Sequence, residues 1–109
     1  MKGDIVFVRF PYTDLTMAKP RPALILLEER DEAVLAYISS RIPSSPSASD
    51  VLVLKSMPSF ASTGLKRDSV IKLNVLATLK NRFIEGLFGE VDGILKIEIN
   101  AKLAACYRI

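Results

Sequence analysis

The chain is predicted to be mostly β: a small antiparallel barrel or curled sheet with one helix at its C-terminus. Short apolar runs alternate with breaks rich in proline, serine or charge along most of the chain, and helical spacing of apolar residues occurs only near the end. The 109 residues are 50% hydrophobic and 25% charged, which is typical of a folded chain. We therefore expect a single domain spanning residues 1–109.

The predicted strands are short runs rich in apolar and β-branched residues. In chain order they span residues 2–10, 22–28, 33–42, 51–54, 69–73, 75–79 and 83–88. The run 22–28 is apolar on both faces, which is typical of a central strand, and a charged turn joins it to 33–42 as a hairpin. The runs 69–73 and 75–79 are expected to meet at a bend near Asn74.

Three breaks separate these strands. A loop is expected from Pro11 to Pro20, and a second break covers 58–64. Prolines and serines dominate 43–50, which predicts a mobile loop there. Phe60 lies in the second of these breaks, and core packing is favoured for its ring over contact with a partner.

A helix is predicted over residues 90–105, with Asp92 as its N-cap. Its apolar stripe consists of Leu95, Ile99, Leu103 and Cys106. Cys106 is the chain's one cysteine, so no internal disulfide is possible, and its apolar surroundings predict a buried, inert thiol.

Composition excludes several kinds of chemistry. With no histidine and one cysteine, the usual zinc sites cannot be built, and histidine acid–base catalysis is excluded. An enzyme of this composition would have to work with Arg, Lys, Ser, Thr, Tyr and carboxylates. No apolar run approaches the roughly 20 residues of a membrane span, and the first residues do not resemble a signal peptide. We expect a cytoplasmic protein whose net charge of +3 permits an acidic or nucleic-acid partner.

The most informative stretch is Lys19-Pro20-Arg21-Pro22, which leads directly into an apolar strand. Each proline restricts its own φ and favours extended geometry in the residue before it. Arg21 is therefore mounted on a stiff segment and has little backbone freedom to lose on meeting an anion. The residues alone leave two interpretations open: a solvated arginine at a strand start, or an anion-binding group.

Three blocks of the chain resemble the PemK/MazF family in order and spacing. They are Lys2-Gly3-Asp4-Ile5-Val6, then Arg21-Pro22-Ala23-Leu24, then Gly64-Leu65-Lys66-Arg67-Asp68-Ser69-Val70-Ile71. The closing Ala77-Thr78-Leu79-Lys80-Asn81-Arg82-Phe83, followed by a strand and a helix, is also similar. Members of this family are toxins of bacterial toxin–antitoxin pairs that cut single-stranded mRNA.

The resemblance implies an SH3-like barrel that works as a homodimer and cuts RNA without a metal or any other cofactor. In that reaction the ribose 2′-hydroxyl attacks the adjacent phosphate and leaves a 2′,3′-cyclic phosphate and a 5′-hydroxyl. Arg21 matches the family's strand-opening arginine, whose planar guanidinium suits a phosphate. Ser39 lies where the family usually has a catalytic threonine, with Ser40 as the reserve, since only one of two successive strand residues can face the site.

The resemblance also implies partners: single-stranded RNA, a cognate antitoxin that competes with RNA, and DNA only through the antitoxin. The residues expected to contact RNA are Lys19, Arg41, Lys66, Arg67 and Tyr12. The chain departs from the family pattern in the short, glycine-free loop before Pro20 and at Val75, where relatives often have glutamine.

Two alternatives to an enzyme stay open. The same fold includes toxins of the CcdB type, which poison gyrase through a C-terminal tryptophan, and this chain has no tryptophan. A non-catalytic RNA-binding module or a protein-interaction module on the same barrel survives that argument. Intact RNA recovered after binding, or weak affinity for RNA, would distinguish them.

Overall fold

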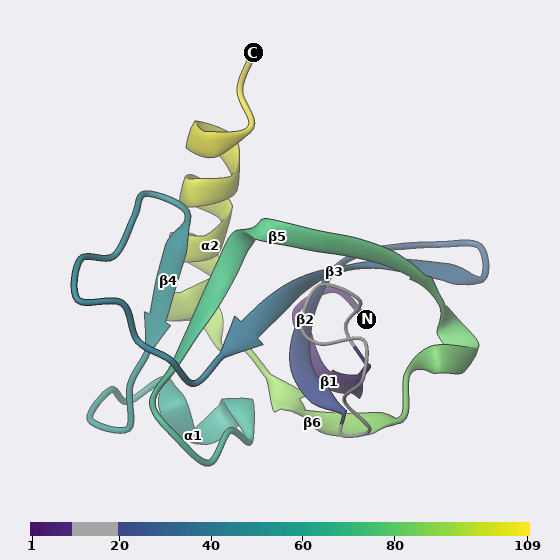
Figure 1. The fold of residues 1–109 in the computed structure, drawn as a ribbon, viewed down its shortest axis with the longest axis horizontal. Coiled ribbons are helices and arrows are strands. Elements are labelled where there is room, and N and C mark those ends of the chain that lie inside the picture. Colours follow the sequence, from purple (N-terminus) through teal and green to yellow (C-terminus); the bar gives the residue numbers. More distant parts are fainter. Residues whose placement is uncertain (10–19) are drawn as a thin grey trace.

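The structure is a computed structural model that describes residues 1–9 and 20–109 (Figure 1). Within those residues it contains six strands, two α-helices and one short 3₁₀ helix. In chain order the elements are β1 (Asp4–Val8), β2 (Arg21–Glu29), β3 (Glu32–Ser39), β4 (Asp50–Val53), α1 (Phe60–Thr63), β5 (Ser69–Lys80), η1 (Asn81–Phe83), β6 (Gly86–Glu90) and α2 (Gly93–Cys106).

All six strands belong to one sheet in the order β4-β5-β3-β2-β1-β6, and every neighbouring pair is antiparallel. The sheet curls, so that β5 and β3 arch over β1, β2 and β6 in Figure 1. Irregularities in three of the ladders, between β1 and β6, β2 and β3, and β3 and β5, increase the local twist and help the sheet to curl. The predicted mostly β, curled antiparallel sheet with a C-terminal helix is confirmed.

The central part of the sheet agrees well with the strand predictions. β2 lies inside the sheet between β1 and β3, as its two apolar faces indicated, and β2 and β3 form the expected hairpin. The runs 69–73 and 75–79 are halves of one long strand, β5. Its pairing partner jumps from Leu76, opposite Ala36, to Lys72, opposite Tyr37, which places the predicted bend around Asn74.

Several predicted boundaries are wrong, each for a local reason. The third strand stops at Ser39 because its hydroxyl accepts a hydrogen bond from the Arg41 N–H, which turns the chain. The last strand begins only at Gly86, because residues 81–83 wind into η1. Within the described residues the first strand ends at Val8, and Phe10 lies outside them. Helix α1 was missed, since four residues are too few for a periodic pattern.

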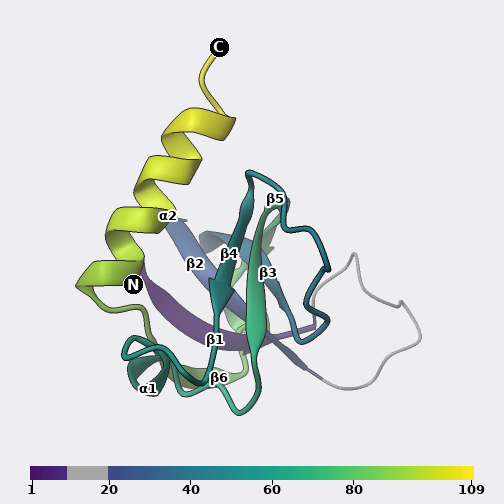
Figure 2. The ribbon, with the colours of Figure 1, turned by 90° about the vertical axis from the view of Figure 1, so that its left-hand side faces the viewer.

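Side chains on the two faces of the sheet form two separate apolar clusters. The first includes Ile5, Leu24 and Ile38 and is covered by Leu95 and Ile99 of α2. Figure 2 shows α2 standing along this face of the sheet, with α1 below it. The second cluster lies on the other face and consists of Val6, Val8, Ala23, Ile25, Ala33 and Leu35. Because strand residues alternate between faces, this division tells us which face each candidate site residue shares.

Helix α2 confirms the predicted N-cap and corrects the prediction for Cys106. The Asp92 carboxylate accepts a hydrogen bond from the Leu95 N–H at 2.9 Å. Leu95 and Ile99 are buried, but Cys106 is exposed, with its thiol 3.6 Å from the Ala48 carbonyl oxygen. The helix rises past the upper edge of the sheet in Figure 1, so its last turn has no cover. Apolar spacing alone could not show where that cover ends.

Candidate nucleic-acid interface

The topology gathers the ends of five strands at one end of the molecule. The end of β1 pairs with the start of β2, the end of β3 with the start of β5, and the start of β5 with the end of β4. The cations on these strand ends and on the segments that continue from them are Arg9, Arg21, Arg41, Lys55, Lys66 and Arg67. Two carboxylates lie among them: Glu85, which pairs with Arg9 at 2.9 Å, and Asp68, so positive charge is in excess. We call this end of the molecule the basic end. A surface with this charge attracts a polyanion such as RNA.

The opposite end carries the hairpin turn between β2 and β3, which is acidic. Its carboxylates are Glu28, Glu29, Asp31 and Glu32. Lys80, at the end of β5, pairs with Asp31 at 3.3 Å and with Glu32 at 3.7 Å. The net charge of +3 is therefore unevenly distributed: positive charge is concentrated at one end of the sheet and negative charge at the other.

Arg21 is the first residue of β2 and lies at the basic end. It pairs in register with Val8 of β1, so its side chain shares the face of Val6, Val8 and Ala23. Pro22 has no N–H to donate, and the pairing of β2 with β3 begins only at Ala23. Arg21 is half-buried there. A half-buried guanidinium on a short, proline-stiffened segment suits a phosphate, because its planar fork can donate two parallel hydrogen bonds.

Ser39 and Ser40 occupy different environments. Ser39 ends β3 opposite Val70 and alternates with Tyr37, which lies opposite Ala23. Ser39 therefore shares the face of Ala23, and hence of Arg21, at the same end of the sheet. Its oxygen accepts the Arg41 N–H at 3.0 Å, which leaves the hydroxyl hydrogen available for donation. Ser40 follows the strand, is exposed, and points to the other face if the alternation continues.

The loop cations fall into a single region. Arg41, Lys66 and Arg67 are exposed at the basic end, together with Lys55, which the sequence interpretation did not single out. Asp68 accepts the Lys55 N–H at 2.7 Å, and Ser69 donates to the Arg67 carbonyl at 2.8 Å. We therefore interpret Asp68 and Ser69 as residues that stabilise the loops around Lys55 and Arg67, and not as ligand-binding residues.

An ion pair on the face of Tyr37 and Ser39 restrains the loop that follows β3. Asp50, at the start of β4, is 3% exposed, and its carboxylate lies 3.0 Å from the Lys72 ammonium nitrogen. Burial alone would raise the pKa of Asp50, but the Ser47 N–H and the Lys72 charge outweigh burial and lower the pKa below its ordinary value. Lys102 of α2 also donates to the Asp50 carbonyl at 2.7 Å. These bonds anchor the last residues of the predicted mobile loop.

Tyr37 is the residue of this face that the sequence interpretation missed. It is half-buried and packs against the second apolar cluster, between Ala23 on one neighbouring strand and Lys72 on the other. Its position two residues before Ser39 was the available signal, since i and i+2 share a face in a strand.

Other sequence predictions have simple outcomes. Lys19 and Tyr12 lie outside the described residues. Phe60 packs against the first apolar cluster, as favoured. In the described part of the chain no three His, Cys, Asp or Glu side chains gather to form a metal site. None of the helices within residues 1–9 and 20–109 has the length and apolarity to cross a membrane.

Comparison with known proteins gives one family and several similar structures. Residues 1–107 match the family described as the PemK-like, MazF-like toxin of type II toxin–antitoxin systems. A sequence search of curated proteins found no match.

The solved structures with a similar fold include proteins from mycobacteria and from Deinococcus. The Mycobacterium tuberculosis toxin MazF-mt6 is 18% identical with a TM-score of 0.73, over 97% of each chain. A mycobacterial endoribonuclease in complex with its cognate antitoxin is 17% identical with a TM-score of 0.71, over 96% of this chain and 91% of that one. MazF from Deinococcus radiodurans is 18% identical with a TM-score of 0.71, over 99% of this chain and 96% of that one.

Proposed function

This chain belongs to the PemK-like, MazF-like toxin family of type II toxin–antitoxin systems, and from that premise we propose that it is a sequence-specific endoribonuclease. Its substrate is single-stranded mRNA, and a cognate antitoxin restrains it. The family match supports the toxin assignment, and the similar mycobacterial structure described as an endoribonuclease supports the activity.

The proposed reaction is internal transfer at phosphorus, without a metal. The 2′-oxygen forms a bond to the adjacent phosphorus, the bond from phosphorus to the 5′-oxygen breaks, and the products carry a 2′,3′-cyclic phosphate and a 5′-hydroxyl. One proton leaves the 2′-hydroxyl and one reaches the 5′-oxygen. Arg21 stabilises the negative charge that develops on the phosphorane oxygens, because a guanidinium stays charged at every working pH. The Ser39 hydroxyl donates a hydrogen bond to a phosphate oxygen.

The observation that carries this proposal is the placement of Arg21 and Ser39 on one face of the sheet at the basic end. They come from different strands, 18 positions apart in sequence, and only the register of the sheet brings them to one face. Arg41, Lys66 and Arg67 extend the same end with exposed cations that suit the RNA backbone. Lys19 and Tyr12 are proposed to contribute a further phosphate contact and a base-stacking surface.

The test is incubation of the purified protein with a long single-stranded RNA in EDTA, followed by analysis of the cut ends. We expect discrete fragments with 2′,3′-cyclic phosphate and 5′-hydroxyl ends. Arg21→Ala and Ser39→Ala should each slow cleavage roughly 100-fold or more, the usual effect of removing a donor from a developing oxyanion. Ser40→Ala is the matched control and should cut at the wild-type rate.

Each contrary result has a clear meaning. Cleavage that survives Arg21→Ala would indicate a contaminating nuclease or a different mechanism. RNA that binds in a salt-sensitive way but stays intact would favour the non-catalytic binding module instead. A requirement for a divalent cation would refute the metal-independent route.

We propose a cytoplasmic homodimer, and an unpartnered side of α2 supports the dimer. Ile94 and Ile97 are 66% and 74% exposed, and they continue at spacings of three and four into the exposed Ala101 and Ala104. In an antiparallel pair of α2 helices each isoleucine would face a partner alanine, so that large and small side chains interlock. Sedimentation should therefore give a dimer at micromolar concentration, and Ile97→Lys should shift it towards monomer.

A further inference from the structure

Tyr37 is the one aromatic residue that the described strands place on the face of Arg21 and Ser39. The other aromatic residues of these strands are Phe7 and Phe88, which stack on each other with their ring centroids 3.7 Å apart. Phe7 alternates with the second-cluster residues of β1 and therefore points to the opposite face, and Phe88 packs against the first apolar cluster. Tyr37 thus brings an aromatic ring next to the two residues proposed to hold a phosphate.

The register of β2 and β3 gives the spacing of these side chains. Ala23 pairs with Tyr37, so extending the same register by two positions sets Arg21 opposite Ser39. Residues directly opposite each other in a sheet have Cβ atoms about 5 Å apart, and two positions along a strand span about 7 Å. Tyr37 lies on the diagonal from Arg21, at about 7–8 Å, which is within reach of an aromatic side chain. Tyr37, Arg21 and Ser39 therefore form one compact group.

The charges differ between the two rows of this group. The row of Arg21 and Ser39 offers a guanidinium and a hydroxyl donor, which suit a phosphate. In the next row the cation opposite Tyr37 is Lys72, whose ammonium nitrogen lies 3.0 Å from the buried Asp50 carboxylate. Because that carboxylate balances the charge of Lys72, the second row suits a flat, uncharged nucleobase better than a second phosphate.

The ring of Tyr37 is held by packing, and part of it stays accessible to solvent. It is half-buried against the second apolar cluster, with the small side chain of Ala23 opposite it on β2. An alanine leaves room beside the ring that a larger side chain would fill. A ring that is already fixed by packing loses little rotamer freedom when a base stacks on it, so the entropic cost of binding is low.

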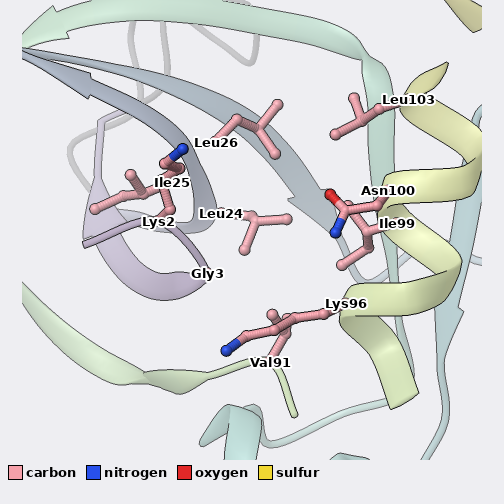
Figure 3. Close-up of a pocket in the computed structure, with 10 residues that line it drawn as sticks. All are labelled: Lys2, Gly3, Leu24, Ile25, Leu26, Val91, Lys96, Ile99, Asn100 and Leu103. Atoms are coloured by element: carbon pink, nitrogen blue, oxygen red, sulfur yellow. The ribbon is translucent and has the colours of Figure 1, made fainter. Parts of the chain in front are cut away.

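The groove between α2 and the first two strands is a poorer place for a base (Figure 3). Its volume is about 320 Å³, and its floor includes Leu24 and Ile99 of the first apolar cluster. No aromatic side chain is found among the described residues that line it, so a base has nothing to stack on there. Leu24 is three positions from Arg21 on β2, so the groove opens on the other face of the sheet, away from a phosphate at Arg21.

We propose that Tyr37 stacks on the base next to the scissile phosphate and thereby positions that phosphate between Arg21 and Ser39. This role rests on the proposed function, because it takes RNA as the ligand. Tyr37 is a positioning and specificity residue: it transfers no proton and takes no part in the bonds that form and break. Preference at a stacked base follows stacking strength, which is greater for purines, so a purine is favoured beside the cut.

The experiment measures binding of two uncleavable oligomers of equal length to the full chain by fluorescence anisotropy. Both have 2′-deoxyribose and the same phosphates, but one carries adenine on every sugar and the other is abasic throughout. Tyr37→Leu should weaken binding of the adenine oligomer roughly fivefold or more and leave binding of the abasic oligomer at the wild-type level. Tyr37→Phe keeps the ring and should bind both oligomers like the wild type.

Two further variants locate the effect. Arg21→Ala should weaken binding of both oligomers, because both carry the phosphates that the guanidinium contacts. Phe83→Leu removes a different aromatic ring, one that is 50% exposed in η1, and should leave both affinities at the wild-type level. Circular dichroism checks that every variant is folded.

The bases beside the cut give a second readout, which loss of stability alone would not change. In a long RNA the wild type should favour a purine at one of the two positions that adjoin the cut. Tyr37→Leu should lose that preference and keep the preferences at other positions. A variant that is only less stable would cut more slowly with the same sequence pattern.

Four results would overturn the proposal. Three concern binding: equal weakening of both oligomers by Tyr37→Leu, a loss with Tyr37→Phe as large as with Tyr37→Leu, and an equally large loss with Phe83→Leu. The fourth is an unchanged base pattern at the cut in Tyr37→Leu. If the wild type prefers the adenine oligomer through Tyr37 but cuts no RNA, the stacking role stands and the nuclease fails. If it cuts RNA but binds both oligomers equally, the nuclease stands and the role of Tyr37 fails.

Discussion

Asp50→Asn is expected to destabilise the fold because it breaks the ion pair that holds the end of the loop after Ser39. The side chain of Asp50 is 3% exposed and that of Lys72 is 29% exposed, with 3.0 Å between the carboxylate oxygen and the ammonium nitrogen. Asparagine keeps an acceptor for the Ser47 N–H, so the substitution removes the charge and little else.

The expected loss of stability can be worked out from the distance between the two charges and from their burial. At an effective dielectric constant of about 20, unit charges 3.0 Å apart attract by roughly 5.5 kcal/mol before the desolvation of both groups is subtracted. Removing one partner of a buried pair costs about 3–5 kcal/mol, and the partial exposure of Lys72 reduces that. We expect Asp50→Asn to lower the free energy of unfolding by about 1–3 kcal/mol and Lys72→Met to lower it by about 2–4 kcal/mol. Lys72→Met is the more costly change because it leaves the buried Asp50 carboxylate without a partner and out of reach of water.

The assay is denaturant unfolding followed by far-ultraviolet circular dichroism, since the chain has no tryptophan to report by fluorescence. The variant that carries both Asp50→Asn and Lys72→Met should lose less free energy of unfolding than the two single variants lose together. Lys80→Met is the matched control: its partners Asp31 and Glu32 are exposed, so it should change stability by less than about 1 kcal/mol.

The pH dependence provides an independent check. The folded pKa of Asp50 is lowered, so its contribution is fully present above the unfolded pKa of about 3.9 and is lost as the pH falls through the folded value. The stability difference between wild type and Asp50→Asn should therefore be constant near neutral pH and shrink below about pH 4. Additive single variants, or a smaller loss for Lys72→Met than for Asp50→Asn, would refute the reasoning.

Four further predictions concern the site and the fold. Arg21→Lys keeps the charge but loses the planar fork, so cleavage should still fall well below wild type, and wild-type activity would contradict the proposed role. Arg67→Ala should lower the slope of log affinity against log salt for single-stranded RNA by about 0.7, and an unchanged slope would exclude a phosphate contact. Gly64→Ala should lower the free energy of unfolding by about 2 kcal/mol or more, because Gly64 has φ +72° and an added Cβ would lie 2.1 Å from a backbone carbonyl oxygen of β6. Gly93→Ala is the control: it has open space around it and should leave thermal unfolding nearly unchanged. Leu95→Ala should lower the free energy of unfolding by about 2–5 kcal/mol in the same assay, because Leu95 of α2 is fully buried in the first apolar cluster. A loss below about 1 kcal/mol would contradict tight packing of the helix on the sheet.

Much of the fold could be predicted because it depends on patterns among residues that are close together in the sequence. The hairpin of β2 and β3, the central place of β2 and the bend near Asn74 all follow from runs of apolar residues and the turns between them. The Asp92 N-cap follows from a short-range hydrogen bond to the Leu95 N–H. Helix α1 escaped prediction because four residues do not complete enough turns to create a period.

The candidate site was predictable only in part. Arg21 stood out because two prolines frame it, and the family blocks pointed to Ser39. Tyr37 could be inferred only from its spacing of two residues from Ser39, and Lys55 carried no local signal; strand pairing and loop position place them beside the other candidate residues. The choice between Ser39 and Ser40 depends on the face each side chain takes, which requires the register.

By itself, the sequence determined the strand runs, the capped helix, the family and the stiff mounting of Arg21, because each depends on neighbouring residues. The tertiary structure alone decided that Arg21 and Ser39 share a face, that Asp50 meets Lys72, and that Cys106 is exposed rather than buried. The physical reason is that burial and side-chain partners depend on what covers each element. That cover comes from residues far away in the chain, which only the register of the sheet and the docking of α2 bring into contact.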